Sequence, residues 1–145
     1  MNRLQYWMRA RTGYQIHSPF LFTLYHEVLF ARMPGILPHD MPRSARRYHE
    51  LVAVISDRFS MHAVSADSST TELAGNDAVT RAMVVSRPHR DSTTEQQWDT
   101  LANDPRFNIA IDLYDVGLLL CNHKLRRQQW LLRQNCLPLS IGTKL

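Results

Sequence analysis

The residue best suited to acid–base chemistry in this chain is His89, in the segment Arg87–Asp91. A histidine changes charge near neutral pH, and it acts as a general base when an acidic side chain orients its ring. The sequence places no acid beside His89 that can be assigned to this task. His89 is therefore the one catalytic candidate, and a structural or solvated loop histidine is the simpler interpretation.

The remaining histidines and the cysteines show no spacing that binds a metal or forms a disulfide framework. A zinc-protease helix needs two histidines four residues apart, and His26–Glu27 and His49–Glu50 each lack the second one. We therefore predict no metal site. Cys121 and Cys136 are unpatterned and fit reduced thiols in a cytoplasmic protein. The histidines considered are His17, His26, His39, His49, His62, His89 and His123.

A run of hydroxyl side chains follows the predicted strand Met61–Ala66. A phosphate or cofactor loop uses such groups at a helix start, and the candidates here are Ser65, Asp67, Ser68 and Ser69. Ser69 with Glu72 also matches a capping box, which predicts a brief helical turn. A polar turn before that helical turn explains the same residues more simply.

The segment Phe107–Asn122 is the most informative part of the chain for the fold. Apolar and more polar residues alternate over Asn108–Leu113, which is typical of a strand with one wetter face. Val116–Cys121 is almost continuously apolar, as in a strand covered on both faces. The two runs meet at Tyr114–Asp115, so we predict a β-hairpin in the middle of a sheet.

Helices and strands are predicted on both sides of the central hairpin. Helices are expected over Asn2–Arg11, from Pro19 to about Arg32, over Pro42–Phe59, and from a capping box of Ser92 and Glu95 to Ala102. Strands are expected over Met61–Ala66, Ala82–Ser86 and Gln128–Arg133, with a loop over Met33–Pro42. We divide the chain into a helical extension (1–41), an α/β domain (42–134) and a tail (135–145).

Composition indicates an ordinary globular domain. The chain has 145 residues, 44% hydrophobic and 21% charged, and a formal charge of +4. No apolar run approaches the roughly 20 residues of a membrane-spanning helix, so we expect no membrane insertion. Fifteen of the 17 basic residues are arginine, with clusters at Arg43–Arg47 and Lys124–Arg127. Such clusters bind phosphates, which leaves a small nucleic-acid-binding module as one alternative.

Two segments resemble a known family. They are Arg11–Leu29, which contains IHSPF, and Ala82–Arg133, which contains IDLYDVGLLL. Both are similar to the ends of class I S-adenosylmethionine-dependent methyltransferases, mostly known from Bacteroidetes. The resemblance implies an α/β fold class, namely a partial Rossmann-like methyltransferase sheet of about four to five strands that ends in an antiparallel hairpin, after an N-terminal helical extension.

The middle of the chain departs from that family. The span Ala63–Thr71 contains no glycine where the family has a glycine-rich cofactor turn, and too few residues follow for the missing strand–helix units. Ser86 and Arg87 stand where the relatives carry two aspartates. We therefore predict a methyltransferase-like protein that has lost S-adenosylmethionine binding and catalysis and acts as a protein-interaction or oligomerisation domain. It is expected to form a homodimer or to bind another protein partner. The alternative is a residual S-adenosylmethionine-dependent methyltransferase with His89 as base.

Overall fold

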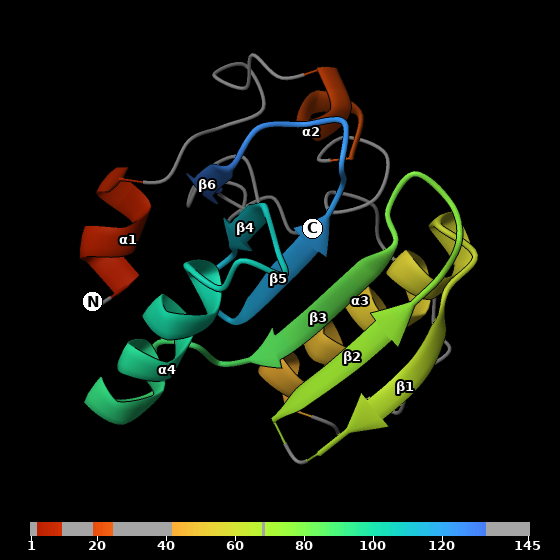
Figure 1. The fold of residues 1–145 in the computed structure, drawn as a ribbon. Coiled ribbons are helices and arrows are strands. Elements are labelled where there is room, and N and C mark those ends of the chain that lie inside the picture. The colour runs from red at the N-terminus through yellow and green to blue at the C-terminus, as the bar shows by residue number, and fades with distance from the viewer. Residues whose placement is uncertain (1–2, 10–18, 25–41, 68, 133–145) are drawn as a thin grey trace.

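A mixed but mostly antiparallel sheet forms the centre of the computed structural model, which describes residues 3–9, 19–24, 42–67 and 69–132 (Figure 1). Six strands in these ranges form one sheet in the order β1-β2-β3-β5-β4-β6. In chain order the elements are α1 (Arg3–Arg9), α2 (Pro19–Leu24), α3 (Arg43–Arg58), β1 (His62–Ala66), β2 (Thr70–Ala74), β3 (Arg81–Ser86), α4 (Ser92–Ala102), β4 (Ile109–Asp112), β5 (Val116–Cys121) and β6 (Gln128–Leu131).

The predicted partial Rossmann-like sheet of four to five strands is wrong. Four of the five strand pairings are antiparallel, and only β4 and β6 run parallel to each other. The connections explain the difference. A parallel pair needs a crossover of a dozen or more residues, whereas residues 75–80 alone join β2 to β3. The first three strands therefore form an antiparallel meander.

The predicted helical turn after Ser69 is also wrong, because this segment begins β2. One carboxylate oxygen of Asp67 accepts the backbone N–H groups of Ser69 and Thr70, both at 2.8 Å. An aspartate that binds the amides two and three residues ahead stabilises a tight turn. Thr70–Ala74 then pairs with β1 and β3, so the strand pairing overrides the local capping signal.

The central β-hairpin is predicted correctly. β4 and β5 form the hairpin, with β3 on one side and β6 on the other. Because β3 and β4 are both antiparallel to β5, they run in the same direction, and α4 connects them. This β3–α4–β4 unit brings the carboxyl ends of two strands to the same end of the sheet. The candidate site lies at that end.

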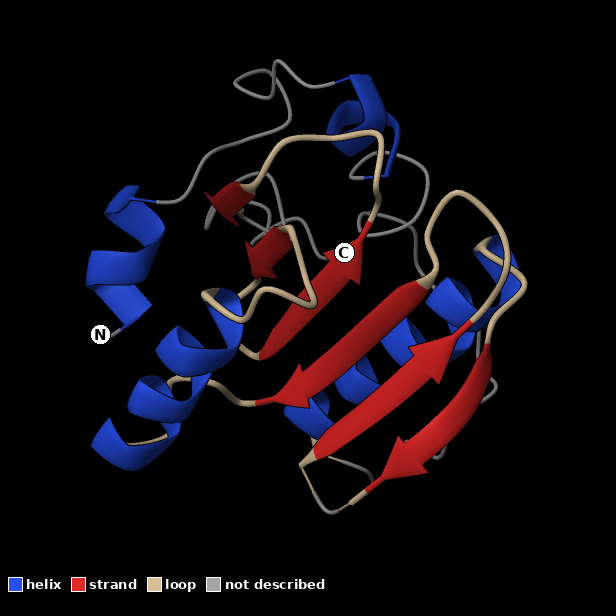
Figure 2. Ribbon diagram, viewed as in Figure 1, coloured by secondary structure: helices blue, strands red, loops and turns tan. Residues whose placement is uncertain are grey.

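Helices cover the two faces of the sheet (Figures 1 and 2). α3 confirms the predicted amphipathic helix, and its buried residues Tyr48, Leu51 and Ile55 pack against one face of the sheet. On that face lie alternate strand residues such as Val84 and Leu118. α1 and α2 lie within the first two predicted helices, and residues 25–41, with most of the second helix and the predicted loop, fall outside the described ranges, as does the tail from residue 133.

The opposite face packs against α4 through Trp98 and Ala102. The N-cap of this helix lies one residue earlier than predicted. Asp91, rather than Ser92, is the N-cap: its carboxylate accepts the N–H of Thr94, and the Thr94 hydroxyl oxygen accepts the N–H of Asp91. Thr94 therefore holds the position in the capping box that the sequence suggested for Glu95.

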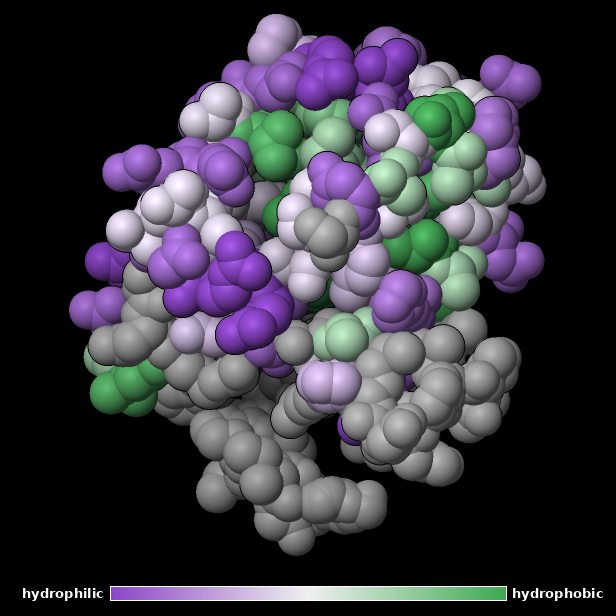
Figure 3. All heavy atoms as spheres, turned by 90° about the horizontal axis from the view of Figure 1, so that it is seen from below, coloured by the Kyte–Doolittle hydropathy of each residue, from purple (hydrophilic) through white to green (hydrophobic). Residues whose placement is uncertain are grey.

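The outermost strand β1 contrasts with the buried centre of the sheet. All five residues of His62–Ala66 are exposed, whereas all of Ile109–Asp112 are buried. Figure 3 shows hydrophobic residues interspersed among hydrophilic ones on the face that it presents.

None of the described helices is both long and apolar enough to cross a membrane.

Candidate functional site

A cluster of His89, Glu95 and Asp112 lies at the carboxyl ends of β3 and β4. His89 belongs to the loop after β3, Glu95 to the first turn of α4, and Asp112 ends β4. Carboxyl ends of parallel strands are the usual place for functional side chains in α/β proteins, because the connecting loops meet there. The fold thus supplies His89 with two acids, which the sequence did not indicate.

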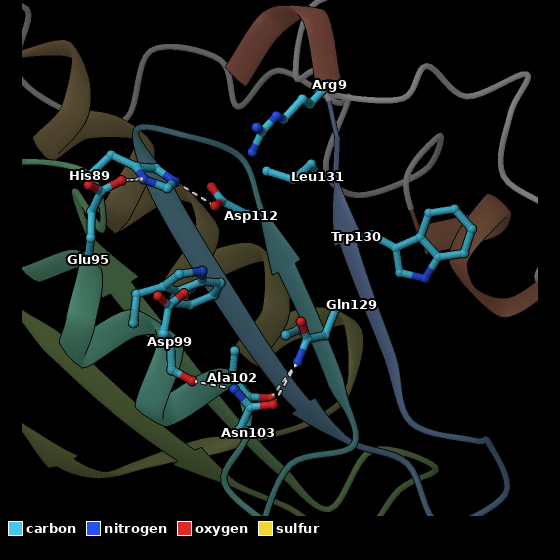
Figure 4. Close-up of a pocket in the computed structure, with 12 residues that line it drawn as sticks. Arg9, His89, Glu95, Asp99, Ala102, Asn103, Asp112, Gln129, Trp130 and Leu131 are labelled. Atoms are coloured by element: carbon cyan, nitrogen blue, oxygen red, sulfur yellow. Dashed lines mark hydrogen bonds and ion pairs between the residues drawn. The ribbon is translucent and has the colours of Figure 1, made fainter. Parts of the chain in front are cut away.

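Both ring nitrogens of His89 contact a carboxylate (Figure 4). Nδ1 lies 2.6 Å from Oε2 of Glu95, and Nε2 lies 2.5 Å from Oδ2 of Asp112. A neutral imidazole has one N–H and one lone pair, and a lone pair facing a carboxylate oxygen is repulsive. When both carboxylates are ionised, both nitrogens carry protons, and His89 is an imidazolium that donates to two acids.

Burial and charge act in opposite directions on this ring. The side chain of His89 is only 6% exposed, and burial lowers the pKa of a histidine. The hydrogen bonds and negative charges of Asp112 and then Glu95 outweigh burial, so the pKa of His89 is raised above its ordinary value of 6.5. The protonated form is the form that the site stabilises.

Tyr114 supports the cluster from the β4–β5 turn. Its ring stacks on His89 with centroids 5.2 Å apart, and its backbone N–H donates to Oδ1 of Asp112 at 2.9 Å. The backbone conformation is unusual here: Arg87 and Tyr114 have φ values of 48° and 72°. Such values are costly for residues with a side chain. One residue in each of the two loops beside the cluster therefore has a left-handed backbone conformation.

Tyr6 attaches α1 to the same corner of the sheet. Its buried hydroxyl donates to the carbonyl oxygens of Asp112, at 2.6 Å, and of Leu132. Its ring meets the edge of Tyr114 with centroids 5.1 Å apart. The helical extension is thus joined to the ends of β4 and β6, close to the backbone of the acid that holds His89.

A groove of about 500 Å³ runs from the cluster along α4. Arg9 and Asp99 bring opposite charges to it, and Trp130 turns its indole away from the cluster (Figure 4). The groove is lined by Arg9, His89, Glu95, Trp98, Asp99, Ala102, Asn103, Ala110, Asp112, Gln129, Trp130 and Leu131. Its polar side chains largely bind one another or the backbone, as the bonds from Gln129 to Asn103 and Ala102 illustrate.

The other sequence candidates lie elsewhere. Asp67 and Ser69 form the β1–β2 turn, Ser65 is an exposed residue of β1, and none of them lines the groove. Ser68 lies outside the described residues. Within the described ranges no group of three histidine, cysteine, aspartate or glutamate side chains is arranged to hold a metal ion.

The basic clusters considered for nucleic-acid binding belong to different elements of the structure. Arg46 and Arg47 are half-buried on α3, and the side chain of Arg43 lies outside the described set. Lys124–Arg127 belongs to the β5–β6 connection, where Arg127 donates to the carbonyl oxygens of Ala102 and Asp104. Arg127 therefore has a structural role in holding that connection against the end of α4.

Comparison with known proteins gives no relative: no family model, no curated protein and no solved structure matches this chain. The resemblance to methyltransferases is therefore a prediction that no comparison tests. The exposed strand β1 and the geometry of the His89 cluster are the observations from which a function can be inferred.

Proposed function

We propose that this protein is a non-catalytic interaction domain that associates with a second copy of itself through the edge of β1. The observation that supports this proposal is the state of that strand. All five residues of His62–Ala66 are exposed, and within the described ranges β1 pairs only with β2. An edge strand presents unpaired backbone N–H and C=O groups, which bind another strand.

The chemistry of the His89 cluster favours a non-catalytic role. A general base needs a free lone pair within reach of the proton that it removes. Both ring nitrogens of His89 face carboxylates instead, at 2.6 Å and 2.5 Å. The former cofactor-loop candidates give no better site, because the Asp67 carboxylate is bound by the amides of its own turn. These contacts support loss of S-adenosylmethionine-dependent catalysis.

A second copy is the partner that the strand itself favours. Two antiparallel edges are self-complementary about a two-fold axis, so one exposed strand pairs with its own copy. His62–Ala66 contains no proline, lysine, arginine or acid, the residues that usually protect an edge. The pairing of β1 with β2 shifts register between Ala63 and Ser65. This bulge shortens the available ladder, so the association is expected to be weak.

The test is the oligomeric state over a wide concentration range. Sedimentation velocity from micromolar to near-millimolar protein should show a monomer–dimer equilibrium. Val64 is 53% exposed, and Val64→Lys adds a charge to the strand edge, which should return the protein to monomer. Gln97→Lys adds the same charge on an exposed position of α4 and should leave the equilibrium unchanged. A wild-type protein that stays monomeric throughout would contradict the proposal.

Ligand titrations test the non-catalytic part separately. Calorimetry with S-adenosylmethionine and with S-adenosylhomocysteine should show no binding heat up to millimolar ligand. Saturable binding of either compound would favour a residual methyltransferase. Retention on nucleic acid that falls steeply with salt would instead favour the nucleic-acid-binding alternative. Neither result depends on the oligomeric state, so the two parts of the proposal fail independently.

A further inference from the structure

The edge of the sheet opposite β1 is formed by β6. Within the described ranges β6 pairs only with β4, and the two strands run parallel. The N–H groups of Gln128 and Leu132 donate toward β4, at 2.7 and 3.0 Å. These bonds repeat at every second residue of a parallel pair. The backbone N–H and C=O groups of Gln129 and Leu131 therefore point away from β4, to the outside of the sheet.

Two cavities lie along this edge. One of them, which we call the edge cavity, has a volume of about 460 Å³ and is lined by Arg9 together with Gln128–Leu131. The other is the groove of about 500 Å³ between β6 and α4. In Figure 4 the side chain of Arg9 lies beside Leu131. The outward backbone groups of β6 therefore face a hollow in the surface, with a cation at one end.

We propose that an extended peptide segment of another protein binds as an additional strand beside β6 and places an acidic side chain on Arg9. The outward N–H and C=O groups of Gln129 and Leu131 hold the main chain of the peptide, and the cavities beside the strand receive its side chains. Arg9 gives the preference for an acid. The proposal is independent of self-association through β1.

The charges around β6 favour an acidic peptide. Arg9 is exposed, and no described residue forms an ion pair with it. It is also the one charged residue among the described residues that line the edge cavity. The acids of the neighbouring groove belong to α4 and to the end of β4 instead. A guanidinium binds a carboxylate through two parallel hydrogen bonds, so a free arginine beside an open strand selects an acid.

A peptide of another protein fits this edge better than a second copy of the chain. Neither outer strand carries an acid, because β1 reads HAVSA and β6 reads QQWL, so the edge of a copy has no carboxylate for Arg9. α1 also stands beside β6, since the Tyr6 hydroxyl donates to the carbonyl oxygen of Leu132. A second sheet would bring its covering helices against α1, whereas one added strand needs only the spacing of about 4.8 Å between strands.

The first test exposes the full chain to a displayed library of random decapeptides. The selected peptides should be rich in aspartate or glutamate and in β-branched residues. Made with capped termini, so that a terminal carboxylate cannot supply the charge, they should shift the amide NMR signals of Gln129 and Leu131 more than those of β1. A library that yields no binder, or binders that leave both signals unchanged, would overturn the proposal.

A charge reversal at Arg9 tests the preference for an acid. Arg9→Glu should weaken binding of the selected acidic peptides by about tenfold or more, and a new selection should give peptides with lysine or arginine. Lys124→Glu makes the same change of charge on an exposed residue of the β5–β6 connection that lines neither cavity, and it should change the affinity much less. Equal losses in the two variants would mean that only long-range charge acts, which would contradict a contact with Arg9.

Two substitutions at Leu131 test the strand pairing. Leu131→Pro removes an outward N–H and keeps the bonds from Gln128 and Leu132 toward β4, so peptide binding should be lost. Leu131→Ala shortens the side chain but keeps the N–H, and should retain most of the affinity. The amide signals of β4 report the fold in both variants. An equal loss in the two, with β4 intact, would show that the peptide contacts the side chain alone and would exclude an added strand.

Discussion

The indole of Trp98 lies directly on the backbone of Gly117. A Cβ atom added at Gly117 would stand 2.4 Å from Cζ3 and 2.7 Å from Cη2 of the ring. The missing side chain is thus what lets α4 approach β5. This contact positions the helix that carries Glu95, so it also sets the geometry of the His89 cluster.

Gly117→Ala should lower the free energy of unfolding by about 1–3 kcal/mol, because one methyl group in a filled site displaces the helix. Urea denaturation followed by circular dichroism measures the change. Trp98→Phe combined with Gly117→Ala should recover part of the loss relative to the sum of the single changes. Gly75→Ala is a matched control, since its nearest contacts would be 3.1–3.2 Å and should cost less. A Gly117→Ala protein as stable as wild type would contradict this packing.

Tyr6→Phe should weaken the attachment of α1 to the sheet at a cost of about 1 kcal/mol. The change removes the hydroxyl that donates to the carbonyl oxygens of Asp112 and Leu132, while the ring contacts with Tyr114 remain. Urea denaturation gives the total loss, and limited proteolysis within α1 shows where it arises. Leu4→Ala changes a 66% exposed residue of the same helix and should stay within about 0.5 kcal/mol of wild type.

Local patterns in the sequence identified the elements whose structure depends on local packing. The alternation over Asn108–Leu113 and the apolar run Val116–Cys121 predicted the hairpin. The order of apolar and polar residues along each segment is enough to indicate that these strands are buried. Ser69 and Glu72 gave a helical signal that failed. Ser69 lies in the β1–β2 turn and Glu72 in β2, between β1 and β3, and pairing across the sheet outweighs a single capping interaction.

The sequence identified one residue of the candidate site but not its partners. His89 was identified by its chemistry, but its partners lie six and 23 residues away and become neighbours only when α4 crosses between β3 and β4. The one available signal was Asp112, an acid at the end of an apolar strand that parallels the strand before His89. The two strands run in the same direction although the antiparallel β5 separates them, an arrangement that only the strand order of the sheet shows.

The β1–β2 turn should make the protein sensitive to acid. Hydrogen bonds from the backbone of Ser69 and then Thr70 lower the pKa of Asp67 below its ordinary value of 3.8. A depressed native pKa adds stability that is fully present above the ordinary value and is lost as the pH falls through the native value. The unfolding free energy measured from pH 5 to pH 2 should decline. Asp67→Asn keeps the acceptor oxygen and should reduce the slope, and an unchanged slope would exclude Asp67 as a source.

Asn108, directly before β4, should be the polar residue on which the β5–β6 connection depends most. Its side-chain nitrogen donates to the carbonyl oxygens of Asn122 and Leu125 at 2.6 and 2.8 Å, and its oxygen accepts the Asn122 N–H at 2.8 Å. Asn108→Asp keeps the size but points a carboxylate at two carbonyl oxygens. We expect a loss of about 2–3 kcal/mol at pH 7, because two acceptors lose their donor and face a charge.

The pH dependence of that variant distinguishes the hydrogen bonds from simple packing. A protonated aspartate can again donate, so Asn108→Asp should recover stability relative to wild type as the pH falls toward 4, which urea denaturation at a series of pH values measures. Asn103→Asp is the matched control, because Asn103 donates to the Asp99 carbonyl oxygen from an exposed position. Its loss should be smaller. An equal loss at both positions, without recovery in acid, would show that the Asn108 contacts do not hold the loop before β6.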